Sequence, residues 1–137
     1  MIDDLCKAIK TRYDSASGDS LRAVATGGLW FTQAKQNVSA PYIVFSWVGS
    51  TTEEYMGSGT TSKIEKAELR FSLFSLDIDG GTVLANAVYL LQNLFDWCSL
   101  SITGYTHVAF ERTGTAAFEK SDDIWSATVN YIAWFDG

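Results

Sequence analysis

Residues 64–98 carry two hydrophobic patterns in direct succession. Between Glu65 and Leu73 every second residue belongs to one set (Glu65, Ala67, Leu69, Phe71 and Leu73), and the intervening residues are polar or charged. This period of two is typical of a strand with one buried face. Beyond a turn at residues 76–81, apolar residues recur at helical spacing: Leu84, Ala87, Val88, Leu91, Phe95 and Cys98. The sequence therefore predicts a strand that leads directly into a helix.

The predicted helix is apolar around most of its circumference. Four further apolar residues widen the repeating face: Val83, Leu90, Leu94 and Trp97. They leave only a narrow polar stripe of Asn86, Tyr89, Asn93 and Asp96. A helix this apolar must be covered on more than one side. The sheet is one cover, and the other is either the first helix of the chain or a neighbouring subunit.

The N-terminal third supplies the remaining early elements. An amphipathic helix is predicted from Ile2 to Tyr13, followed by a short helical piece over residues 20–24 and an edge strand over residues 29–31. Pro41 opens a strand over residues 42–48 that is apolar nearly throughout. Such a run predicts a strand that is covered on both faces.

Residues 49–62 are rich in Gly, Ser and Thr and lack any apolar periodicity. They join two strands that we expect to be antiparallel neighbours, although two to five residues are enough for a hairpin. Long connections of this kind are often functional, so we expect this one to contact another protein; the alternative is passive mobility. The predicted contact residues here are Glu53, Glu54, Tyr55, Met56 and, directly after the connection, Lys63.

Two further strands are predicted near the C-terminus, over residues 105–112 and 124–135. On the last strand one alternating set is apolar and forms core: Trp125, Ala127, Val129, Tyr131, Ala133 and Phe135. The opposite set is apolar at its ends, which leaves Ile132 and Trp134 in need of a cover. Together the elements predict an α+β fold in one domain over residues 1–137: a mainly antiparallel sheet of about four strands, with an N-terminal helix and a second long helix packed on one face.

Charge and composition restrict the possible partners. The formal net charge is −6, and no basic stripe is present, which argues against sequence-specific nucleic acid binding. No apolar run approaches about 18 residues, and the first residues are acidic, so we expect neither a membrane span nor a signal peptide. The two cysteines, Cys6 and Cys98, lie at apolar helical positions and are expected to be buried thiols.

The candidate chemical motifs are incomplete. His107 is the single histidine, and Glu111 lies four residues along the same strand, too far for direct pairing. The segment from Asp77 to Gly81 resembles the start of a calcium loop, but Val88 occupies the position that requires a bidentate glutamate. A glycine-rich segment over residues 57–63 lacks the Gly-Lys-Ser/Thr ending of a phosphate loop. We therefore expect no enzyme activity, no metal and no cofactor.

The order of elements resembles a known family, the small tail-completion proteins of long-tailed bacteriophages, also called tail terminators or head-to-tail joining proteins. The resemblance rests on the Gly-Gly-Leu-Trp segment at residues 27–30, on residues 41–45, and on the strand–turn–helix over residues 64–95. It implies a ring, commonly a hexamer, that caps the tail tube and joins the tail to the head connector. It also implies assembly in the bacterial host cytoplasm and a final place in the virion, with no cofactor and no catalysis. The Trp-rich last strand is not part of the family pattern.

We expect lateral contacts of such a ring to bury Ile132, Trp134 and part of the face around Trp97. Three alternatives remain open. The aromatic residues could line the pocket of a small ligand-binding module. A minor enzyme could use His107. Another neck or minor tail component could share the same fold.

Overall fold

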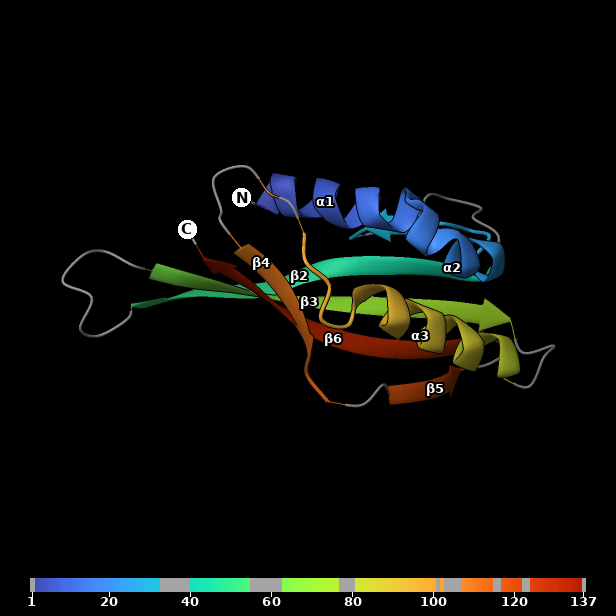
Figure 1. The fold of residues 1–137 in the computed structure, drawn as a ribbon. Helices are drawn as coiled ribbons and strands as arrows, with labels where there is room; N and C mark the ends of the chain where they lie inside the picture. Colours follow the sequence, from blue (N-terminus) through green and yellow to red (C-terminus); the bar gives the residue numbers. More distant parts are fainter. Residues whose placement is uncertain are drawn as a thin grey trace.

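The computed structural model describes residues 2–32, 40–54, 63–76, 81–100, 102, 107–114, 117–121 and 124–136. Within them, helices cover one face of a six-stranded sheet (Figure 1). The helices are α1 (Ile2–Asp14), the short 3-10 turn η1 (Ala16–Gly18), α2 (Asp19–Val24) and α3 (Thr82–Phe95). The strands are β1 (Leu29–Phe31), β2 (Tyr42–Glu54), β3 (Lys63–Leu76), β4 (His107–Arg112), β5 (Ala117–Ser121) and β6 (Ile124–Asp136).

The strands are ordered β1-β2-β3-β6-β4, and β5 also pairs with β6. β1 runs parallel to β2, and the other described pairs are antiparallel. β6 has two partners along one side: β4 pairs with residues 131–136, and β5 pairs with residues 124–128. The α+β class and the antiparallel character are confirmed, whereas the expected count of about four strands is too low.

β5 is the strand that sequence patterning missed. Its five residues are all exposed, so the segment has no apolar alternation to mark it as a strand. Its pairing with β6 depends on backbone hydrogen bonds, which any non-proline sequence can supply.

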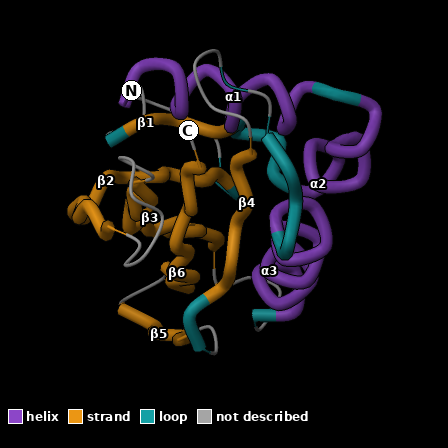
Figure 2. Tube along the Cα trace, turned by 60° about the vertical axis from the view of Figure 1, so that its left-hand side comes forward, coloured by secondary structure: helices purple, strands orange, loops and turns teal. Residues whose placement is uncertain are grey.

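The core lies between the sheet and the helical layer (Figure 2). The alternation predicted for β3 and β6 is confirmed, because one set of side chains on each strand is buried in a single cluster with side chains from the helices. That set comprises Ala67, Leu69, Phe71 and Leu73 on β3 and Ala127, Val129, Tyr131 and Ala133 on β6. We call the opposite side of the sheet, which none of the described helices covers, the outer face.

Two predictions for β2 are wrong. The strand is buried on one face only: Ile43 and Phe45 face the core, Val44 is half-buried, and Val48 is exposed at a register shift between Trp47 and Gly49. The strand is also longer than expected, because residues 49–54 continue the ladder with residues 63–68. The polar connection therefore shortens to residues 55–62, which lie outside the described residues. Backbone groups form the hydrogen bonds between paired strands, so polar residues can take part in a strand. The polar composition of residues 49–54 therefore led to a wrong prediction of where β2 ends.

α3 is buried on the face that its spacing predicts, through Leu84, Ala87, Val88, Leu91, Leu94 and Phe95. It contacts β3 and β6 on one side and α2 on another. The second element that covers the apolar surface of α3 is thus α2 of the same chain, where we expected the first helix or a neighbouring subunit. The last turn of α1 adds a polar link, because Arg12 Nε donates a 2.6 Å hydrogen bond to the carbonyl oxygen of Leu94.

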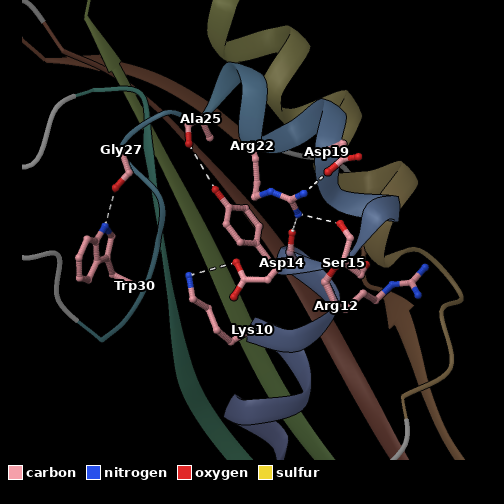
Figure 3. A network of polar contacts seen from close by, with 10 residues as sticks. Lys10, Arg12, Asp14, Ser15, Asp19, Arg22, Ala25, Gly27 and Trp30 are labelled. Carbon is pink, nitrogen blue, oxygen red and sulfur yellow. Dashed lines mark hydrogen bonds and ion pairs between the residues drawn. The ribbon is translucent and has the colours of Figure 1, made fainter.

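A single arginine holds the corner between α1 and α2 (Figure 3). The Arg22 guanidinium donates hydrogen bonds to the carbonyl oxygens of Tyr13 and Ser15, where α1 ends, and pairs with the Asp19 carboxylate. The Tyr13 hydroxyl donates to the Ala25 carbonyl oxygen at 3.3 Å. Arg22 therefore satisfies the Tyr13 carbonyl, which the end of α1 leaves without a helical partner, and is a second donor to the Ser15 carbonyl, which also accepts from the Gly18 N–H.

Candidate functional site: an exposed tryptophan and an uncovered sheet face

Trp97 is the most exposed large apolar residue among the described residues, with 74% of its surface accessible. It follows Asp96, whose extended conformation ends α3. Its φ is 56°, in the left-handed region, where glycine or asparagine is the usual occupant after a helix. The sequence thus places a large aromatic residue at a position that disfavours it.

Backbone hydrogen bonds hold Trp97 in this conformation. Its N–H donates to the Phe110 carbonyl oxygen at 2.9 Å, and the Phe110 N–H donates to the Cys98 carbonyl oxygen at 3.1 Å. These bonds attach the chain after α3 to β4. The Phe110 side chain is fully buried, so the attachment point is itself fixed in the core.

The residue before Trp97 is fixed by two side chains. Asp96 accepts a 2.6 Å hydrogen bond from the Tyr131 hydroxyl, and Arg112 lies 3.5 Å from its other carboxylate oxygen. Burial of Tyr131, together with its hydrogen bond to Asp96, raises the pKa of that phenol well above its ordinary value. Tyr131 therefore stays protonated and remains a donor to Asp96 at neutral pH.

This arrangement gives a large aromatic side chain on a rigid base. A strained left-handed residue persists only where its surroundings determine it strongly, and such residues gather at functional sites. Tryptophan is also among the residues that contribute most to protein–protein binding, because it buries a large area at a small entropic cost. The interface role of Trp97 remains a prediction, and the structure leaves its side chain open to a partner.

The outer face carries an apolar area at one end. Phe74 lies opposite Tyr42, and their rings stack with centroids 5.1 Å apart. Leu76 lies opposite Ile124, and 49% and 47% of their respective surfaces are exposed. Residues directly opposite on an antiparallel ladder project to the same side, so the four side chains are neighbours. We call Tyr42, Phe74, Leu76 and Ile124 the outer apolar patch.

At the other end of the outer face, Ile132 and Trp134 are half-buried. Trp134 Nε1 donates to Glu111 at 3.1 Å, and Lys66 Nζ lies 4.6 Å from the centre of an indole ring. The chain therefore supplies part of the cover that we expected from a neighbouring subunit. This makes Ile132 and Trp134 less open to a partner than the outer apolar patch.

The remaining predicted contact residues cluster at the β2–β3 hairpin. Glu53 pairs in register with Ile64, and Glu54 with Lys63, so their backbones form the last rungs of the ladder. Figure 1 shows this end of the hairpin extending beyond the helices. Tyr55 and Met56 lie outside the described residues. The register thus places the backbones of Glu54 and Lys63 opposite each other.

The described residues hold no group of three or more His, Cys, Asp or Glu side chains that could bind a metal. None of the helices in the described part of the chain is long and apolar enough to cross a membrane.

Cys98 is buried, and this burial raises its pKa to about 11. Cys6, expected to be buried, is half-exposed. An open groove of about 400 Å³ lies between α1 and the segment of Ser99, Leu100 and Ile102, with Asp4, Lys7, Thr11 and Arg12 also among its lining.

The sequence analysis named Trp97, whose interface role stays a prediction, and did not identify the outer apolar patch. Phe74 and Leu76 continue the alternation of β3 beyond Leu73, where the predicted pattern ended. Leu76 was expected in the turn, and that expectation is wrong because β3 extends to Leu76. The alignment of Phe74 and Leu76 with the rest of the patch depends on the register of three strands, and alternation within single strands does not give that register.

The fold is shared with solved structures. A chain of the virion of a native gene transfer agent particle superimposes with a TM-score of 0.70 over 99% of this chain and 97% of that chain, at 13% identity. A second solved protein matches with a TM-score of 0.70 over 98% of this chain and 95% of its own, at 14% identity. No protein-family model matches the chain, and no curated protein matches its sequence. At this level of identity the likeness establishes the fold.

Proposed function

We propose that the protein is a structural component of a phage-like virion. The observation that carries this proposal is the match, over nearly the whole length of both chains, to a chain of a gene transfer agent virion. The exposed, rigidly held Trp97 supports it, because an assembly protein needs surfaces that remain available in the single copy.

Within that class we propose the role of a tail terminator. Copies of the chain form a ring, a hexamer in the simplest case, that caps the tail tube and joins the tail to the head connector. Its partners are further copies of itself, the tail tube protein and the connector proteins. The protein assembles in the bacterial host cytoplasm and then remains in the virion. This role requires no catalysis and no cofactor.

The acidic balance of the chain suits a ring through which DNA passes. Six copies, each with a formal charge of −6, carry a total charge of −36. Negative charge around a channel repels the phosphate backbone and keeps DNA from adhering to the wall.

Light scattering and negative-stain imaging of the purified protein, alone, with assembled tail tubes and with the head connector, test the proposal. We expect rings, either in solution or on the tube ends. A protein that stays monomeric and binds neither end of the tubes would contradict the terminator role. Binding at the connector but not at the tube would favour another neck or minor tail component.

A small ligand-binding module is the second candidate, and the groove beside α1 is the observation that favours it. For that function we expect a monomer whose melting temperature rises with small ligands. A Thr11→Arg variant, at an exposed position that lines the groove, should lose this shift.

A further inference from the structure

We propose that Trp97 of one copy packs on the outer apolar patch of the next copy in the ring. The proposal rests on the ring-forming function above and identifies the two surfaces that meet. It assigns a partner to two features that the structure leaves uncovered.

The two surfaces lie at different places on the molecule. Trp97 follows α3, which belongs to the helical layer, whereas the patch is on the outer face of the sheet. Tyr131, which holds Asp96, and Ile124 are seven residues apart on β6, or roughly 23 Å at the rise of a strand. Contact between Trp97 of one copy and the patch of another therefore joins unlike surfaces. Repeating such a contact generates a ring when the rotation between copies closes.

The backbones of both surfaces are fixed before the copies meet. The patch is formed by opposed residues on three paired strands, so its backbone is fixed before a partner arrives. The backbone that carries Trp97 is equally fixed, by its bond to Phe110 and by the partners of Asp96. Docking of two preformed surfaces orders few groups, which limits the entropy lost on binding.

Charges beside the two surfaces favour a second copy as the occupant. Arg12 bonds to the carbonyl of Leu94, just before Trp97, and Arg112 pairs with Asp96, so this surface carries two guanidinium groups against one carboxylate. The patch has an acidic neighbour in Glu119, which is exposed and lies opposite Ser126, itself opposite Phe74 on the same face.

The same charges argue against a two-fold contact between two Trp97 surfaces, because that contact would bring like guanidinium groups together. The end of the outer face at Trp134 is a poorer binding surface for Trp97, since Lys66 and Glu111 already contact the Trp134 indole. The Leu76–Ile124 end is therefore the apolar area on this face that has the weaker cover within its own chain.

Disulfide capture tests the contact with full-length protein in a Cys6→Ser, Cys98→Ala background. One preparation carries Ser99→Cys, beside Trp97, a second carries Ser121→Cys, opposite Ile124 in the ladder, and a third, the matched control, carries Val48→Cys. Substitution of either exposed serine leaves Trp97 and the outer apolar patch in place. Val48 is exposed on β2 to the same extent as Leu76, but it lies at the register shift away from the patch. Under mild oxidation we expect the Ser99→Cys and Ser121→Cys proteins to link to each other at least ten times faster than either links to itself or to the control.

Equal linking to the Val48→Cys control, or faster linking of Ser99→Cys to itself, would overturn the inference. A failure of this contact can be distinguished from a failure of the ring-forming function. If both the Trp97→Gly and the Ile124→Asp variants assemble into normal rings, the proposed contact is excluded and the terminator role still stands. Absence of any assembly by the unmodified protein, with or without tubes, would remove the role itself.

Discussion

The hydroxyl of Tyr131 donates a 2.6 Å hydrogen bond to Asp96, and so joins the middle of β6 to the residue that ends α3. The Tyr131 ring stacks at 5.6 Å on Phe110 and meets the edge of Phe71 at the same distance. Trp97, the most exposed aromatic residue of the described surface, thus follows directly after a residue that is bonded to Tyr131, one of the most buried.

A Tyr131→Phe variant should lower the free energy of unfolding by about 1–3 kcal/mol. The substitution keeps the ring stack and removes one hydrogen bond to a charged acceptor, which leaves the half-buried Asp96 with Arg112 alone. Urea denaturation followed by circular dichroism measures the change. Tyr89→Phe is the matched control, because Tyr89 is 61% exposed and should show no change beyond about 0.5 kcal/mol. Equal effects of the two variants would show that the Asp96 bond contributes little.

A Trp97→Gly variant should change the stability of the single copy by less than about 1 kcal/mol. Relief of a left-handed φ is worth roughly 1–2 kcal/mol, and the larger conformational freedom of glycine in the unfolded chain offsets about 0.5–1 kcal/mol of it. Little packing is lost, since the side chain is mostly exposed. Thermal unfolding measures the change.

Trp47→Ala is the comparison for that experiment. Trp47 is half-buried against the core, so its truncation should cost about 2–4 kcal/mol. A similar loss for Trp97→Gly would mean that Trp97 packs against its own chain, and that it is not available to a partner.

Stability should fall above about pH 9. Burial raises the pKa of Cys98 from 9.0 to about 11, and burial and the bond to Asp96 raise the pKa of Tyr131 above 10.0. At pH 10 to 11 the unfolded chain has released these protons while the folded chain retains them, so each group reduces stability by up to about 1.4 kcal/mol per pH unit. Below pH 9 neither group changes stability. Denaturation midpoints from pH 7 to 11 measure the effect, and Tyr131→Phe should flatten the slope above pH 10.

The two thiols should react at very different rates. Cys98 is 5% exposed, and with a pKa of about 11 roughly one thiol in a thousand is ionised at pH 8. Cys6 is half-exposed on α1. Labelling with a maleimide at pH 8 should modify one thiol per chain quickly and the second on the timescale of unfolding. Rapid labelling of Cys98 would mean that residues 97–99 separate readily from β4.

The sequence predicted those parts of the fold in which burial follows a simple period. The middle parts of β3 and α3 were placed correctly because Phe71 and Leu91 belong to repeats that one buried face imposes, whereas their ends were not, since β3 extends to Leu76 and α3 stops at Phe95. β5 was missed because Phe118 and its neighbours are all exposed, and the end of β2 was misplaced because Thr51 and Glu54 are held by backbone pairing. Trp97 continues the apolar repeat of α3, yet it points away from the core because the helix ends at Asp96. Hydrophobic spacing does not report where a helix ends.

The small strand β5 has a consequence for how copies meet. A long bare strand edge pairs with any other edge, so it would let chains associate without limit on number. Here the free side of β6 at residues 124–128 is closed by a five-residue strand that carries Glu119 and Lys120, both exposed. Short, charged edges resist further strand pairing. The chain thus discourages open-ended sheet growth, so that association by side-chain contacts of fixed geometry can stop at a definite number of copies.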